Sequence, residues 1–106
     1  MNGQTKSLSA LGLTARGRRE AEITGLSVDS RDVREGHLFA ALPGVNAHGA
    51  EFIQTALEAG ASAILTNTAG AKIAEISLAG SDAALVVVEN PRQALAFAAA
   101  LWFEAQ

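Results

Sequence analysis

The chain has 106 residues, of which 49% are hydrophobic and 18% are charged, and its formal net charge is −3. This length suits a single domain with one core, and the composition is that of a folded protein rather than a disordered one. Eight Lys and Arg residues stand against eleven Asp and Glu residues, which gives no support for a nucleic-acid-binding surface. The one basic cluster, residues 16–19, is followed by Glu20 and Glu22 and predicts a solvated turn.

Cysteine is absent, which excludes disulfides, zinc–thiolate sites and thiol nucleophiles. The only two histidines are His37 and His48, and no third ligand accompanies them, so no metal site is predicted. The polar first residues lack the apolar segment of a signal peptide, and no apolar run approaches the roughly 20 residues of a membrane span. We expect a soluble, cytoplasmic protein that binds neither nucleic acid nor membrane.

Two strands are predicted in the first half of the chain. Residues 23–28 alternate loosely between apolar and small polar side chains, which is typical of a strand. Residues 38–42 form a short apolar run that ends at Pro43-Gly44, which is typical of a buried strand followed by a turn. The polar segment 31–36 between them predicts a hairpin-like or bent connection.

A helix, a strand and a glycine turn follow in an order that indicates parallel pairing. Residues 50–59 predict a helix whose apolar face is formed by Phe52, Ile53, Ala56 and Leu57. Gly60 stands where a left-handed C-cap is expected, and residues 61–66 predict a short buried strand. Strand, helix and strand in this order form a βαβ unit.

The last third of the chain predicts two further helices and a central strand. Residues 69–78 predict a short helix with Ile73 and Ile76 at helical spacing, ended by Gly80, and residues 84–88 predict a strand. The final helix is expected to start at Pro91 with Asn90 as its N-cap. Its apolar face contains Leu95, Ala98, Ala99 and Trp102.

The predicted fold class is α/β, with a small mixed sheet of about four to five strands flanked by helices. Residues 1–22 form an N-terminal segment, in which residues 7–13 predict one or two helical turns and residues 14–22 a loop. Residues 23–106 form the α/β domain. The last helix reaches Gln106 without a stop signal, so we expect the natural chain to continue into further domains.

Polar loops follow both early strands, and such loops at strand ends are where α/β domains commonly bind ligands. Asp29-Ser30-Arg31 follows the first strand, and the loop 45–49 follows the second. The alternative is turn chemistry, because Asp and Ser also bond to their own backbone. Arg31 is equally open to an ion pair with a nearby acidic side chain.

The sequence resembles the N-terminal domain of the Mur ligase family. The motifs that carry this resemblance are Ser-Val-Asp-Ser-Arg at 27–31, the run 36–44 ending in Ala-Leu-Pro-Gly, His-Gly-Ala-Glu-Phe at 48–52, and 88–95. The Ala-Leu-Pro-Gly motif resembles that of the family members that add the third residue, diaminopimelate or L-lysine, to the peptidoglycan stem peptide. The resemblance extends over residues 23–106.

The resemblance implies that this domain docks the uridine end of UDP-N-acetylmuramoyl-L-alanyl-D-glutamate, with the remaining ligase domains as partners in cis. The positions that match the uracil and ribose contacts are Val28, Ser30, Val45, Asn46 and Ala47. A hydroxyl at Ser30 and an amide at Asn46 suit the donors and acceptors of a uracil edge. Further candidates for ribose or diphosphate contact are Arg31, His48 and Arg92.

The sequence also departs from the family pattern. It contains no Gly-x-x-x-x-Gly-Lys-Ser/Thr loop, and it lacks the magnesium ligands and the carbamylated lysine of the central domain. ATP and Mg²⁺ are therefore expected as cofactors of a longer parent ligase only, with no cofactor and no catalytic residue in these 106 residues. A common family aspartate is replaced by His48. The alternative function is a free-standing regulatory or partner-binding α/β domain without a ligase role.

Overall fold

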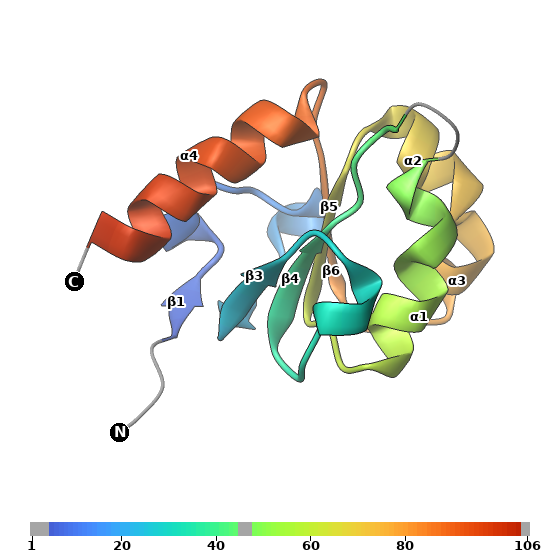
Figure 1. Cartoon of the computed structure of the whole chain (residues 1–106), viewed down its shortest axis with the longest axis horizontal. Coiled ribbons are helices and arrows are strands. Elements are labelled where there is room, and N and C mark those ends of the chain that lie inside the picture. The colour runs from blue at the N-terminus through green and yellow to red at the C-terminus, as the bar shows by residue number, and fades with distance from the viewer. Residues whose placement is uncertain (1–4, 45–47, 105–106) are drawn as a thin grey trace.

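Four parallel strands form the centre of the molecule. The computed structural model describes residues 5–44 and 48–104. The sheet has the order β3-β4-β5-β6 (Figure 1). Its strands are β3 (Gly25–Ser27), β4 (His37–Ala40), β5 (Ala63–Thr66) and β6 (Ala84–Val87). All three neighbouring pairs are parallel, with Leu38 of β4 opposite Leu26 and Ala63. The α/β fold expected from the sequence is confirmed.

A short antiparallel pair, β1 (Lys6–Ser7) with β2 (Glu22–Ile23), stands as a second, two-stranded ladder. The predicted strand 23–28 is thus divided at Thr24 between this ladder and the main sheet. The division is only nominal, because the Thr24 amide still donates to the Gly36 carbonyl at 2.9 Å. The sequence predicts one mixed sheet. In the structure, the antiparallel pairing lies in the β1–β2 ladder and the parallel pairings lie in the four-stranded sheet, and one continuous chain segment joins the two.

The connection between β3 and β4 is bent, and the hairpin alternative is wrong because the two strands are parallel. Residues 28–36 contain a 3₁₀ turn, η3 (Ser30–Asp32), whose N-cap Asp29 accepts the Arg31 amide. This turn lets the chain return to the amino end of the sheet in fewer than the roughly twelve residues that a parallel crossover commonly needs.

Helices cover both faces of the sheet (Figure 1). One face carries η3 together with η4 (Gly49–Phe52), α1 (Ile53–Glu58), α2 (Thr68–Ile73) and α3 (Glu75–Ala79). The other face carries α4 (Pro91–Glu104), which packs against η1 (Ser9–Leu11), β4 and β5. A further short 3₁₀ segment, η2 (Arg16–Arg18), lies near β6.

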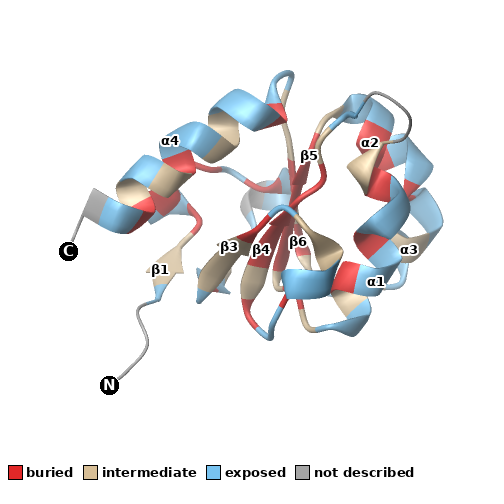
Figure 2. Cartoon of the chain, viewed as in Figure 1, coloured by how far each residue is buried: buried red, intermediate tan, exposed pale blue. Residues whose placement is uncertain are grey.

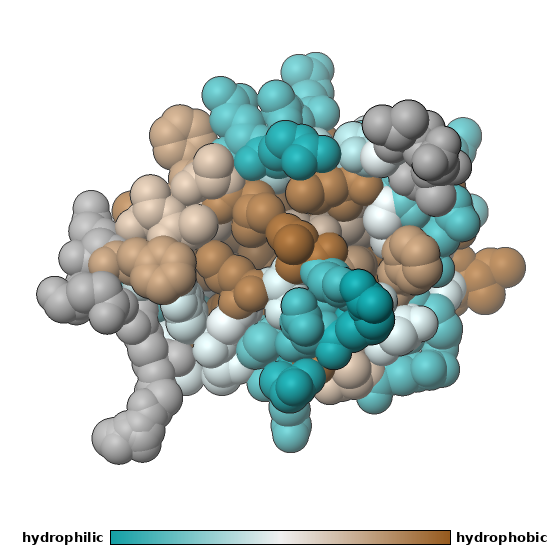
Figure 3. Space-filling view, viewed as in Figure 1, coloured by the Kyte–Doolittle hydropathy of each residue, from teal (hydrophilic) through white to brown (hydrophobic). Residues whose placement is uncertain are grey.

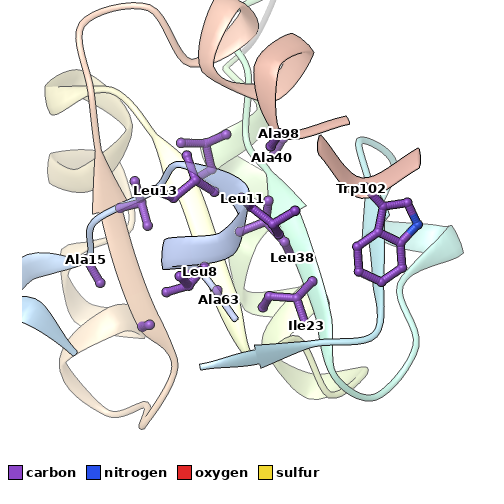
Figure 4. Packing of buried hydrophobic residues seen from close by; sticks show 13 residues of the cluster. Leu8, Leu11, Leu13, Ala15, Ile23, Leu38, Ala40, Ala63, Ala98 and Trp102 are labelled. Atoms are coloured by element: carbon purple, nitrogen blue, oxygen red, sulfur yellow. The ribbon is translucent and has the colours of Figure 1, made fainter. Parts of the chain in front are cut away.

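The core is divided by the sheet into two clusters, because successive side chains of a strand point to opposite faces. Leu38 and Ala40 belong to the cluster under α4, whereas Phe39 and Ala41 belong to the cluster under α1. In Figure 4, side chains from η1, the sheet and α4 point toward one another in the first cluster. Figure 2 shows the buried strands in the middle and exposed outer faces on the helices.

The last predicted helix is present as α4, whereas the helix predicted over 50–59 is α-helical only in α1 and is preceded by the 3₁₀ turn η4, in which Phe52 is 50% exposed. Asn90 caps α4, since its Oδ1 accepts the Gln93 amide at 3.1 Å. The predicted helix 69–78 is interrupted at Ala74, and the side chains of Ile73 and Ile76 are 52% and 90% exposed rather than packed. The interruption turns Ala74 into the core, where it is buried among the second cluster. Within the described residues, no helix is long and apolar enough to cross a membrane.

His37 of β4 and Ser27 of the edge strand β3 form a polar contact between neighbouring strands. The Ser27 hydroxyl lies 2.8 Å from Nδ1 of His37, and a Cβ on Gly25 would come within 2.6 Å of Nε2. The imidazole is therefore pressed against the backbone of β3. Burial lowers the pKa of His37, and the charge of Arg34 lowers that pKa further.

Gly60 and Gly80 form a matched pair for testing the turns after the helices. Gly60 has φ +105°, and an added Cβ would lie 2.8 Å from the Glu35 Cα, whereas Gly80 has ordinary φ and open surroundings. We expect Gly60→Ala to lower the free energy of unfolding by about 1–3 kcal/mol. Gly80→Ala should leave it within about 1 kcal/mol of wild type. Urea unfolding measures both values. Equal stabilities of the two variants would contradict the expectation that alanine is strained at position 60 and tolerated at position 80.

His37 should make stability depend on pH. Its pKa is lower in the folded chain than in the unfolded chain, so the unfolded state takes up the proton first as pH falls. The free energy of unfolding should therefore decrease as pH falls below about 6.5, the ordinary histidine value. His37→Gln should flatten this dependence between pH 5 and 7.5 in urea unfolding. If the free energy of unfolding of the variant depends on pH as steeply as that of wild type, other groups cause the dependence.

Candidate functional site

The carboxyl ends of the four strands meet at one edge of the sheet, and a hollow of about 720 Å³ lies beside the ends of β3 and β4. It is lined by Val28, Asp29, Ser30, Arg31, Phe39, Leu42, Gly49 and Phe52. Other hollows, of about 480 and 510 Å³, lie beside the amino end of the sheet and beside α4. The hollow at the carboxyl edge contains the first polar loop expected from the sequence.

Apolar side chains form the floor and two walls of this hollow. Phe39 is buried beneath it, while Val28 and Phe52 remain 59% and 50% exposed. Figure 3 shows hydrophobic surface in the middle of this face of the molecule, bordered by hydrophilic side chains. Exposed apolar side chains around a concavity are a common feature of ligand sites.

A charged pair forms the rim of the hollow. The Arg31 guanidinium donates through Nη2 to Oδ2 of Asp29 at 2.6 Å and through Nε to Oδ1 at 3.0 Å. Hydrogen bonds from Arg31 lower the pKa of Asp29 to about 2, and the same carboxylate raises the pKa of Arg31. The ion pair, which the sequence left open, is thus formed with Asp29. The Arg31 side chain is still 86% exposed, so the guanidinium remains accessible.

Ser30 contributes a free hydroxyl between the apolar wall and the charged rim. Its backbone carbonyl accepts the Val33 amide at 3.4 Å as part of η3. Across residues 5–44 and 48–104, its side-chain hydroxyl makes no hydrogen bond. A half-buried hydroxyl of this kind is able to donate to and accept from a ligand.

His48 lies at the base of the next loop, with both ring nitrogens engaged. Nδ1 accepts the Ala50 amide at 2.9 Å, and Nε2 lies 2.9 Å from Oδ1 of Asn67. His48 also pairs with Pro43 in an isolated antiparallel bridge. Its side chain therefore faces the protein and not the hollow. Asn67 has no counterpart in the sequence predictions, because a single asparagine between strand and helix gives no signal beyond an N-cap.

Arg92 approaches the same edge from α4. Its Nη2 donates to the Pro43 carbonyl at 3.3 Å, and the side chain is exposed. This contact brings α4 to the loop that follows β4. Arg92 does not line the hollow, but its positive charge lies at the same edge of the sheet.

Three of the predicted contact positions, Val45, Asn46 and Ala47, lie outside the described residues. Of the other predicted positions, Val28, Ser30 and Arg31 line the hollow together. The apolar lining by Phe39, Leu42 and Phe52 was not predicted as part of a site. In the sequence, these three residues look like ordinary core residues. In the structure, Phe52 differs from a core residue because it is 50% exposed.

The hollow combines three kinds of group that could contact a ligand. No group of three or more His, Cys, Asp or Glu side chains that could hold a metal ion occurs within the described part of the chain. The hollow offers apolar contact, one hydroxyl and an exposed guanidinium. These groups suit a ligand that has a flat ring, polar ring edges and a nearby negative charge.

The sequence of the chain is similar to a family model and to curated ligases. Residues 22–102 match the model of the Mur ligase family, catalytic domain. The UDP-N-acetylmuramoyl-L-alanyl-D-glutamate--2,6-diaminopimelate ligase of Streptomyces coelicolor is 53% identical over 72 residues, covering 68% of this chain and 13% of the relative. The ligase of the same name from Zymomonas mobilis is 36% identical over 107 residues, covering 97% of this chain and 20% of the relative.

Solved structures show the same fold. MurF from Acinetobacter baumannii matches with a TM-score of 0.68 and 18% identity, covering 95% of this chain and 22% of that chain. MurF ligase from Thermotoga maritima in complex with ADP matches with a TM-score of 0.54 and 32% identity, covering 70% and 15%. The chain spans between about an eighth and a fifth of the length of the two curated relatives named above. With a family model matched over most of its length, the chain belongs to the Mur ligase family.

Proposed function

We propose that this chain docks the uridine end of a UDP-N-acetylmuramoyl-dipeptide, as the substrate-recognition part of a peptidoglycan ligase. The observation that carries the proposal is the hollow at the carboxyl ends of β3 and β4. It combines exposed apolar walls with a hydroxyl that has no partner among the described residues. The relatives named above are ligases whose names contain a UDP-N-acetylmuramoyl dipeptide.

The uracil ring would lie between Val28 and Phe52, which bury its faces. The Ser30 hydroxyl would bond to the polar edge of the ring, where a uracil has carbonyl acceptors and an N–H donor. Arg31 would face ribose or phosphate, since its exposed guanidinium lies at the rim. Val45, Asn46 and Ala47 remain contact positions predicted from the sequence alone.

The catalytic chemistry of a ligase would lie elsewhere in a longer protein. We propose ATP-driven amide formation for that parent, which would use ATP and Mg²⁺ in its other domains. This sequence contains no glycine-rich ATP loop of the Gly-x-x-x-x-Gly-Lys-Ser/Thr form. The role of these residues is therefore to recognise and orient one end of the substrate.

Ser30→Ala should weaken binding of UDP about five-fold, because it removes one hydrogen bond worth about 1 kcal/mol. The dissociation constant follows from NMR shift changes during titration with UDP and with the muramoyl dipeptide nucleotide. Ser77→Ala, an equal change in α3 away from the hollow, should bind like wild type. No shift change at residues 28–31, even at millimolar nucleotide, would refute docking and favour the partner-binding alternative.

Arg92→Gln should weaken binding of UDP more than binding of uridine, because only UDP carries the negative charge that a guanidinium attracts. The difference should decrease with added salt, since the side chain is exposed. Titration of both ligands at low and high salt gives the ratio of affinities. Lys72→Gln in α2 makes the same change in net charge and should leave this ratio unchanged. An equal loss of affinity for uridine and for UDP would contradict a contact between Arg92 and the diphosphate.

A further inference from the structure

One imidazole joins two loops at the carboxyl edge of the sheet. His48, just before η4, accepts the Ala50 amide through Nδ1 at 2.9 Å. Its Nε2 lies 2.9 Å from Oδ1 of Asn67, which follows β5 and caps α2. The two residues come from different strand-to-helix connections, so their contact ties these connections together.

The hydrogen bonds allow only one arrangement of protons. Because the Ala50 amide donates to Nδ1, that nitrogen carries no proton, and the proton of the neutral ring is on Nε2. Nε2–H then donates to Asn67 Oδ1, which also accepts the Gly70 amide at 2.8 Å. The amide of Asn67 is therefore oriented with its oxygen toward both donors.

This contact supports one wall of the hollow. His48 is the N-cap of η4, and η4 supplies Gly49 and Phe52 to the lining. Gly49 is held on its other side as well, because its amide donates to the Leu42 carbonyl at 2.8 Å and an added Cβ would meet the Leu42 backbone. The start of the wall is thus anchored twice to the protein, at Leu42 through Gly49 and at Asn67 through His48.

The imidazole has little freedom to leave this position. A Cβ added at Gly70 would collide with Thr66 Oγ1 and come within 2.8 Å of His48 Cε1. The ring therefore packs directly on the first turn of α2. Thr66 itself is buried and donates to the Ala41 carbonyl at 2.9 Å, which fixes the end of β5 against the end of β4.

We propose that His48 is a positioning residue for the ligand hollow, held by Asn67 as the neutral Nε2–H tautomer. It orients η4 so that Phe52 faces the bound ring, and it makes no ligand contact of its own. The inference rests on the proposed docking function for its ligand, a uridine nucleotide. The tautomer and the orientation of Phe52 are properties of the free protein.

The tautomer is measured first, on the wild-type chain without ligand. Long-range ¹H–¹⁵N correlation at neutral pH should show a protonated Nε2 and an unprotonated Nδ1 for His48. A proton on Nδ1 would overturn the proposal, since the Ala50 amide would then have no acceptor. This result does not depend on whether any variant folds or whether UDP binds.

Two substitutions at Asn67 separate the imidazole contact from helix capping. Serine also accepts the Gly70 amide as an N-cap but is too short to reach His48, whereas aspartate offers acceptors to both donors. We expect Asn67→Ser to weaken UDP binding roughly five-fold, and Asn67→Asp to bind like wild type. His48→Ala should lose as much as Asn67→Ser. Asn67 does not line the hollow, so a loss at this position reports positioning.

The outcomes distinguish this proposal from the docking function. Wild-type affinity for UDP in a folded Asn67→Ser variant would overturn the positioning role. If wild type itself fails to bind UDP, the docking function falls, and the Phe52 ring signals then decide the positioning role. Ring signals that shift in Asn67→Ser but not in Asn67→Asp would support it, and unchanged signals in both would overturn it.

Discussion

The parallel direction of all four strands is the constraint on which the rest of the structure depends. It sends every strand-to-helix connection to the same edge of the sheet, so residues 28–32, 41–44 and 67 meet there although the sequence separates them. Even the short connection after β3 obeys this constraint, because η3 returns the chain to the amino end. A hairpin between β3 and β4 would have moved Ser30 away from the other loops.

Parallel strands are covered on both faces, and this chain covers them with small side chains. Alanines at positions 40, 63 and 84 lie under α4 and η1, while Phe39 and Ile64 fill the opposite face. Six large apolar side chains of the described residues are nevertheless exposed: Val28, Phe52, Ile73, Ile76, Phe97 and Phe103. Of these six, Val28 and Phe52 line the hollow at the carboxyl edge of the sheet.

The sequence was sufficient for most of the architecture and for half of the site. Apolar runs marked β4, β5 and β6, because a strand buried on both faces has an unmistakable composition. Ile73 and Ile76 were misassigned, since helical spacing identifies a common face but not the side that faces the core. The polar lining at Ser30 was predicted from its place in a polar loop after a strand and from the family resemblance. The apolar walls and the Asn67 contact depend on tertiary distances that no local pattern encodes.

The two sides of the hollow are held in different ways, and this difference has a consequence for binding. The Asp29–Arg31 pair is exposed, so its net contribution to stability is small and the rim is able to adjust. The wall formed by η4 is held at its start by the hydrogen bonds of Gly49 to Leu42 and of His48 to Asn67. In the proposed docking role, a fixed apolar wall would orient a flat ring without the entropy cost of ordering a loop, while the rim would adapt to the charged remainder of the ligand. Recognition of the ring end would then depend on the rigidity of the sheet edge more than on the number of polar contacts.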